Sequence, residues 1–366
     1  MKTLLAFVFS FLFFTSAAYA QGRTDRELSD LIGQVKSVEA YHVSFTMKDG
    51  ITEEAKREPW YSDTYNIDGK KTEDVFYGHP GSKCVYTYDT RGRCTGYEVY
   101  TVTSDNNRAL YRKHIYTLDD KGNRIEHKIF DSDGNLADRF AFKYDTKGNE
   151  IEEVSFTFDG LIKEQRIYTY NVRGNLTGQI IVGADGSIKR KYDNRYDNEG
   201  KRIEGRRYKG DILRYKVIIR YDEKRRIIEE ETMEYNAIPE LREEYDADPG
   251  KVVFTYDDNK RTKDVATYSS DGSLKERVIL TYDAKGNEVG RAEFKADGSP
   301  NYNEVKFHED IDNQWSKLLG SLTGHTLVEF EYDSRGNWTR KTFLIQSGKG
   351  DEPQRYLAEE RVITYY

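Results

Sequence analysis

Aromatic and apolar side chains recur at every second position over short stretches of this chain. A spacing of two places both side chains on the same face of a β-strand. Each stretch has room for about eight residues, which is a normal strand length. The pattern therefore predicts strands with one ring-bearing face, as in the pairs Tyr86/Tyr88, Phe142/Tyr144, Tyr168/Tyr170, Phe254/Tyr256, Leu280/Tyr282 and Phe330/Tyr332.

Many of these stretches end in the motif Tyr-Asp-x-x-Gly, which we call the first turn. Eleven starts can be aligned, and most are 25 or 26 residues apart. A period this steady indicates an array in which each unit is one supersecondary element. Clear copies start at Tyr88, Tyr144, Tyr196, Tyr282 and Tyr332, and weaker copies at Tyr65, Leu118, Tyr170, Tyr221, Tyr256 and Phe307.

A second turn follows about 12 residues later and ends in Asp-Gly, as at Gly134, Gly160, Gly186 and Gly298. In both turns Asp can accept backbone hydrogen bonds, and Gly can take the left-handed conformation. Turns this short make successive strands antiparallel neighbours.

We therefore predict an all-β fold of about ten tandem two-stranded hairpins with a period of about 25–26 residues, covering residues 35–366. The hairpins would form a long antiparallel meander or an open β-solenoid, which leaves edge strands for pairing with another chain. The alternative is a five-bladed propeller-like ring, since two units make about one four-stranded blade.

Two irregular segments interrupt the array, near residues 236–250 and 308–325. The first contains Ile238-Pro239-Glu240, and the second contains Trp315. Residues 21–34 form a leader before the repeats. Thr24 and Glu27 have the spacing of a capping box, which predicts a short helix over residues 25–32.

Residues 1–20 have the features of a signal peptide. Lys2 precedes an apolar stretch from Leu4 to Phe14, and Ala18-Tyr19-Ala20 is a small-x-small cleavage site. The apolar stretch is too short to span a membrane as a helix. We expect an exported, soluble protein with no membrane span, located in the periplasm or at the cell surface.

The amino-acid composition indicates which classes of binding partner to expect. The net charge is −7, with acidic and basic residues interspersed, so the basic face of a nucleic-acid binder is not expected. Only 37% of residues are hydrophobic, but 29 are Tyr and 17 are Phe, which predicts a thin sheet packed through its rings. Charges on both faces of 201–208 and 220–231 argue against a membrane barrel.

The Tyr-Asp-x-x-Gly-(Asn/Arg) turns, together with the Asp-Gly turns between them, resemble the YD-repeat or RHS-like family of secreted bacterial proteins. Copies with Asn include Gly122-Asn123, Gly148-Asn149, Gly174-Asn175, Gly286-Asn287 and Gly336-Asn337. The resemblance covers about residues 35–366. It implies a β-repeat array of the short, stand-alone Bacteroidetes type without a toxin domain, and it implies no activity.

No catalytic, cofactor or metal constellation stands out in the sequence. The histidines are spread over different repeats, and zinc-ligand spacing is absent. Asp131-x-Asp133-Gly134 and Asp310-x-Asp312 resemble fragments of calcium loops but lack the Glu at position twelve. We expect no enzyme and no cofactor. If the protein were an enzyme, we would expect its site in the irregular segment Phe307–His325. The histidines are His42, His79, His114, His127, His308 and His325.

The two cysteines, Cys84 and Cys94, flank the first turn at Asp89–Gly92. If Asp89 lies opposite Arg93, then Cys94 faces Tyr88 and Cys84 faces Glu98. That offset of four residues, about 13 Å along the strand, is too long for a disulfide. We predict that the two thiols are not bonded to each other.

These features predict a non-enzymatic binding or scaffold protein of the periplasm or cell surface. Repeat arrays offer long surfaces to partners, and the irregular segments provide loops for specificity. The alternative is a carbohydrate-binding protein that uses the aromatic face. The partner can be a protein or a polysaccharide.

Overall fold

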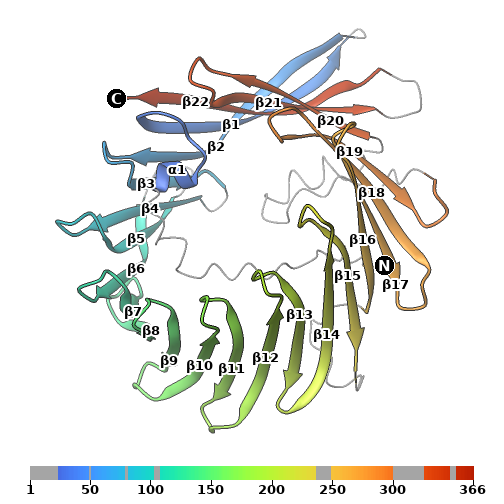
Figure 1. Cartoon of the computed structure of the whole chain (residues 1–366). Coiled ribbons are helices and arrows are strands. Elements are labelled where there is room, and N and C mark those ends of the chain that lie inside the picture. Colours follow the sequence, from blue (N-terminus) through green and yellow to red (C-terminus); the bar gives the residue numbers. More distant parts are fainter. Residues whose placement is uncertain are drawn as a thin grey trace.

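The computed structural model describes residues 24–48, 51–78, 81–102, 108–235, 249–299, 325–346 and 352–366. These residues form one short helix and 22 strands that run in chain order around a ring (Figure 1). The elements are α1 (Asp25–Leu28), β1 (Val35–Lys48), β2 (Ile51–Tyr65), β3 (Lys71–Phe76), β4 (Gly81–Tyr88), β5 (Cys94–Val102), β6 (Arg108–Leu118), β7 (Arg124–Phe130), β8 (Leu136–Tyr144), β9 (Glu150–Phe156), β10 (Ile162–Tyr170), β11 (Leu176–Gly183), β12 (Ile188–Tyr196), β13 (Arg202–Lys209), β14 (Ile212–Tyr221), β15 (Ile227–Glu234), β16 (Gly250–Asp257), β17 (Thr262–Ser269), β18 (Leu274–Tyr282), β19 (Glu288–Lys295), β20 (His325–Tyr332), β21 (Trp338–Gln346) and β22 (Gln354–Tyr365).

The sheet is a closed antiparallel β-barrel. Each strand pairs with the next along the chain, and β1 pairs with β22 from Val35↔Tyr365 to Ser44↔Leu357. The all-β prediction is therefore confirmed, but the open meander, the solenoid and the five-bladed propeller are all wrong. The reason is that the terminal strands hydrogen-bond to each other, so the accumulated curvature of the hairpins closes one continuous sheet.

The ring is wide. Twenty-two strands spaced about 4.8 Å apart give a circumference of about 105 Å and a diameter of about 33 Å. Barrels of about eight strands can be filled by the side chains of their own walls, whereas the lumen widens as strands are added. The walls of this ring therefore do not pack on one another across its centre, which accounts for the low hydrophobic content.

The two kinds of turn occupy opposite rims, because they alternate along an antiparallel meander. The first turns have the chemistry that the sequence predicts. At Asp145, the backbone N–H donates to Asn149 O (2.9 Å), and Gly148 N–H donates to Asp145 O (3.1 Å). The Asp145 carboxylate accepts from the N–H groups of Lys147 and Asn149, and Gly148 has φ = +87°.

The tyrosine of the first turn ties each unit to the preceding one. The Tyr144 hydroxyl donates to the carbonyl of Arg124, and the Tyr170 hydroxyl donates to that of Glu150 (3.0 and 2.7 Å). Each acceptor is the first residue of a strand that follows the previous first turn. The same bond recurs at Tyr88, Tyr196, Tyr221 and Tyr256. The motif tyrosine is therefore a connection between units as well as a face residue.

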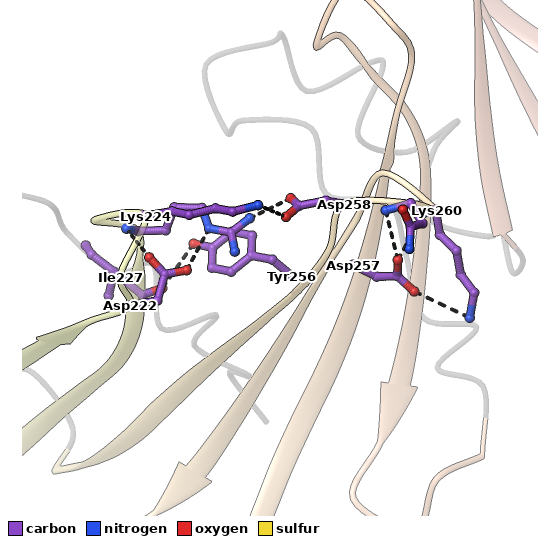
Figure 2. Close-up of polar contacts among 9 residues, drawn as sticks. Asp222, Lys224, Ile227, Tyr256, Asp257, Asp258 and Lys260 are labelled. Carbon is purple, nitrogen blue, oxygen red and sulfur yellow. Dashed lines mark hydrogen bonds and ion pairs between the residues drawn. The ribbon is translucent and has the colours of Figure 1, made fainter.

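One weakly paired junction is reinforced by charged turns. β15 and β16 pair only from Glu229↔Val253 to Thr232↔Gly250. Figure 2 shows Lys224, from the β14–β15 turn, reaching Asp258 on the β16–β17 turn (2.5 Å). Arg226 also contacts Asp258 (2.6 Å). The first turns thus bridge this junction, while the predicted irregularity at 236–248 lies outside the described residues.

The N-terminal segment packs against the place where β1 and β22 close the barrel. Thr24 and Glu27 form the predicted capping box, but α1 ends at Leu28 rather than at residue 32. Beyond it, Ile32 N–H donates to the Asn337 side-chain oxygen (2.7 Å), while the Asn337 amide donates to Ile32 O (2.9 Å). The buried cluster of Leu31, Val35, Val38 and Tyr65 lies here. Within the described ranges, no helix is long and apolar enough to cross a membrane.

The two faces of the sheet differ. The face that carries the first-turn tyrosines, here called the tyrosine face, holds most of the stacked rings. The opposite face carries ion pairs between neighbouring strands, such as Lys113–Glu98 (2.9 Å) and Arg139–Glu126 (2.8 Å). Exposed pairs of this kind contribute about 0.2–1 kcal/mol each, so the rings and the hydrogen-bonded ladder hold the wall together.

Candidate functional site

A ladder of five stacked rings crosses five neighbouring strands on the tyrosine face. It consists of Tyr86 (β4), Tyr97 (β5), His114 (β6), His127 (β7) and Phe140 (β8). Successive ring centroids lie 5.6, 4.2, 5.2 and 5.6 Å apart. We call this set the ring ladder. Of its members only Tyr86 belongs to the ring pairs predicted from the sequence, and two histidines form the centre of the ladder.

Two of the four ring pairs are stacked face to face, and the other two, Tyr86–Tyr97 and His114–His127, are tilted. The planes of Tyr97 and His114 differ by 10°, and those of His127 and Phe140 by 27°. Stacked rings of this kind stabilise the sheet by about 0.5–1.5 kcal/mol per pair beyond their buried area. The two stacked pairs therefore cover one face each of Tyr97, His114, His127 and Phe140.

The two histidines of the ladder are hydrogen-bonded to each other. His114 Nδ1 and His127 Nε2 lie 3.0 Å apart, so one ring donates and the other accepts. Burial, Arg124 and His114 lower the pKa of His127 to about 4. Burial and Arg112 lower the pKa of His114 as well. Both imidazoles are therefore neutral at neutral pH.

Charged side chains lie next to the ladder on the same face. The Arg124 guanidinium stands over the rings of Tyr116 (5.0 Å) and Phe142 (4.8 Å). Burial and the neighbouring Glu153 raise the pKa of Glu150 to about 7, although Arg124 acts in the opposite direction. A half-buried carboxyl with this pKa changes its charge near neutral pH.

The second-turn rim carries an exposed apolar row. Phe158 is 81% exposed and Leu161 66% exposed, both in the β9–β10 turn. Ile162, Ile188 and Ile212 are also exposed and lie at the starts of β10, β12 and β14. The turns β9–β10, β11–β12 and β13–β14 lie side by side along the bottom of Figure 1. We call these five residues the apolar rim.

A cavity of about 400 Å³ continues this surface toward β6. It lies at the β7–β8 turn, which is also a second turn, and its apolar lining comes from Leu110, Ile115 and Phe130. The strand ends on either side of 236–248 and 300–324 reach the same rim, because β15 to β16 and β19 to β20 are second-turn connections. One rim therefore combines exposed apolar side chains and a cavity.

The candidates named from the sequence are distributed as follows. His42 stacks on Trp60, with centroids 4.5 Å apart. His79, His308, Trp315 and Asp310–Asp312 lie outside the described residues, as does the His325 side chain. Asp131 is used as a turn residue: it accepts from the N–H groups of Asp133 and Asn135. In the described ranges, no group of three His, Cys, Asp or Glu side chains is arranged to hold a metal ion.

The cysteines are free, as predicted. Cys94 lies opposite Tyr88 as expected, but Cys84 lies opposite Val99 rather than Glu98. The difference of one residue comes from a bulge between Thr87 and Tyr88. Burial raises the pKa of the Cys84 thiol to about 11, so this group is a thiol at neutral pH.

Sequence reasoning missed the histidine pair and the apolar rim. The register about the first turn at Asp119–Gly122 places Tyr116 opposite His127, which puts His114 diagonally across from it. The unbulged register that was applied to the cysteines would have placed His127 opposite Ile115, on the other face. Only the bulge between Thr117 and Leu118 brings His127 to the face of His114. The rim was visible as an Ile or Leu residue soon after several second-turn glycines, as in Gly160-Leu161-Ile162 and Gly186-Ser187-Ile188.

No family model matches this chain, and no curated protein matches it. Among solved structures, it is similar to the complex described as TcdB2-TccC3, with 14% identity and a TM-score of 0.31 over 83% of this chain. The chain spans only 19% of the length of that protein. It is also similar to porin-like proteins from Bacteroides uniformis ATCC 8492 (13% identity, TM-score 0.25, 90% of this chain and 96% of that one) and Bacteroides vulgatus ATCC 8482 (9%, 0.18, 91% and 98%). Likenesses at this level leave the family and the function open.

Proposed function

We propose that this protein is an exported, non-enzymatic binding protein, in which the closed ring is the scaffold and the apolar rim binds a protein partner. The observation that carries the proposal is the exposure of Phe158, Leu161, Ile162, Ile188 and Ile212 on one rim. Exposed apolar side chains that gather on neighbouring turns of one rim are typical of interaction sites. We propose export and a YD-type repeat character for the chain together with this binding role.

A protein partner fits this surface better than a polysaccharide does. Stacking against a sugar requires a free ring face, and four of the five ladder rings each have one face covered by a neighbouring ring. The rim instead offers aliphatic side chains and a cavity lined by Leu110, Ile115 and Phe130. Such apolar surfaces are typical of the buried centre of protein interfaces.

The closed barrel also favours docking through side chains. The edge strands expected for an open sheet are absent from most of the described wall, because the terminal strands pair with each other. Residues 51–59 of β2 have no strand partner on the side of β3 within the described ranges. Their charged residues and Pro59 are typical of an edge protected against strand addition.

The proposal can be tested by site-specific crosslinking in the cells that make the protein. A photo-reactive residue is placed at Phe158 and, as the matched control, at Val172. Both positions are exposed apolar turn residues, at 81% and 89%, but Val172 lies on the first-turn rim. We expect one partner protein to be captured from position 158 and not from position 172.

The captured partner must then bind the purified chain directly. Leu161→Ser should weaken binding at least about tenfold, since truncation of interface anchors commonly costs more than 1 kcal/mol. Val172→Ser should leave binding unchanged, and both variants should melt like wild type. Equal capture from both rims would contradict the proposal. So would glycan-array binding that survives Leu161→Ser, or turnover of a substrate by the chain.

A further inference from the structure

The center of the ring ladder contains two imidazole nitrogens that converge without a carboxylate between them. His114 Nδ1 and His127 Nε2 are 3.0 Å apart. His114 is stacked on Tyr97 at 4.2 Å, and His127 on Phe140 at 5.6 Å. Packing against these rings keeps the two imidazoles side by side on neighbouring strands.

We propose that His114 and His127 form a two-histidine site for a divalent transition metal, with Cu²⁺ preferred over Ni²⁺ and Zn²⁺. Imidazole nitrogen is a ligand for all three ions, and affinities generally follow the order in which Cu²⁺ binds most tightly. With metal–nitrogen bonds of about 2.05 Å, nitrogens 3.0 Å apart subtend an angle of about 94° at the metal. This angle fits adjacent positions of a square-planar or octahedral ion better than the tetrahedral angle that Zn²⁺ adopts.

Metal entry replaces the hydrogen bond within the pair. Both rings are neutral, and each carries one N–H. The donor ring moves its proton to its other nitrogen, so that both facing nitrogens present lone pairs and no proton is lost overall. Each ring must also turn, so that its lone pair points at the metal rather than at the other ring. The terminal torsion of histidine is broad enough for this movement.

The chain supplies two ligands, and the remaining positions are left to water or to a group from outside. This agrees with the lack of any three-residue metal group among the described residues. Arg124 lies over the neighbouring Tyr116 ring, 5.0 Å from its centroid. Its positive charge opposes a bound cation, as it does the protonation of His127, and an anionic co-ligand such as chloride or a carboxylate would offset this repulsion. The site is distinct from the apolar rim and does not depend on it.

The test uses the untagged chain without residues 1–20, freed of metal with a chelator. CuCl₂, NiCl₂ and ZnCl₂ are titrated separately by calorimetry, and the Cu²⁺ complex is examined by electron paramagnetic resonance. We expect one Cu²⁺ per chain, with coupling to two imidazole nitrogens, and weaker binding of Ni²⁺ and Zn²⁺. His114→Gln and His127→Gln should each weaken Cu²⁺ binding at least about tenfold and leave coupling to one imidazole.

His42→Gln is the matched control, because His42 also stacks on an aromatic ring but lies far along the chain on β1. It should bind Cu²⁺ like wild type. Circular dichroism checks that all three variants fold. Should His114→Gln and His127→Gln bind as tightly as wild type, or should wild type show no two-nitrogen coupling, the assignment of this site would be overturned.

Discussion

Replacing Glu150 by Gln should stabilise the protein at alkaline pH and have little effect at acidic pH. Glu150 is the first residue of β9, and its side chain lies on the tyrosine face. Burial and Glu153 raise the pKa of its carboxyl from 4.5 to about 7. A raised pKa in the folded state means that the native protein binds this proton more tightly than the unfolded chain does. The resulting stabilisation is complete below pH 4.5 and is lost as the pH rises through 7.

The magnitude follows from the shift. A difference of about 2.5 pKa units corresponds to about 3.4 kcal/mol at most. Glu150 is only partly buried, so solvent screening reduces the expected effect to about 1–2 kcal/mol. Gln is neutral at every pH and keeps the stability that the ionised Glu150 loses. Relative to wild type, Glu150→Gln should therefore be nearly neutral at pH 4.5 and more stable by about 1–2 kcal/mol at pH 8.

The assay is urea unfolding followed by circular dichroism between pH 4.5 and pH 8, with the variant and wild type compared at each pH. Taking the difference removes the contributions of all other titrating groups. Glu152 provides the matched control on the same strand, because hydrogen bonds from Lys143 and Gln165 lower its pKa. Glu152→Gln should lower the free energy of unfolding by up to about 1 kcal/mol at neutral pH, whereas Glu150→Gln should raise it.

A flat difference between Glu150→Gln and wild type across this range would refute the reasoning. It would mean that the Glu150 carboxylate is solvated in the native state, or that Arg124 compensates its charge. Lower stability of Glu150→Gln at pH 8 would point to the second explanation, because the carboxylate would then contribute a favourable ion pair.

Three further substitutions test the repeat and the closure. Tyr196→Phe removes the hydroxyl that donates to Leu176 O (2.7 Å), and should lower the free energy of unfolding by about 1 kcal/mol in urea titrations; an unchanged midpoint would mean that water replaces the bond. Gly96→Ala places a methyl group 2.1 Å from His114 O at a residue with φ = +152°, so we expect a lower melting temperature and altered His114 chemical shifts. Asn337→Ala removes both hydrogen bonds to Ile32, and hydrogen exchange should accelerate first in β1 and β22; uniform acceleration around the ring would argue against a local role at the closure.

The turns could be predicted from the sequence because their interactions are local. Asp145, Gly148 and Asn149 lie within five residues, and their hydrogen bonds require no knowledge of distant strands. The partner predicted for Cys84 was wrong by one residue, which shows that turn chemistry alone does not fix the strand register. A bulge next to the first-turn tyrosine shifts the register by one residue, and the same bulge recurs in other hairpins, for example at Tyr144.

Closure could not be predicted in the same way. The pair Val35↔Tyr365 joins strands at opposite ends of the array. Whether hairpins of one kind form an open sheet or a ring depends on twist and curvature summed over many strands, and a small change per hairpin alters the outcome. The ring ladder falls between these cases. A ring-bearing face was expected from the spacing of two, while the presence of His114 and His127 in the ladder depended on the register of β6 and β7.

The pairing of β1 with β22 also constrains the order of events when the protein is made. Synthesis begins at the N-terminus, so one side of β1 has no partner until β22 has been made. Val35, for example, pairs with Tyr365. At about 5–20 residues per second, synthesis alone makes this delay roughly 15–60 s. During that time the unpaired side of β1 is a template for the wrong strand, from the same chain or from another. Accelerating completion of the chain, rather than strengthening any one hairpin, is therefore the more direct way to raise its yield.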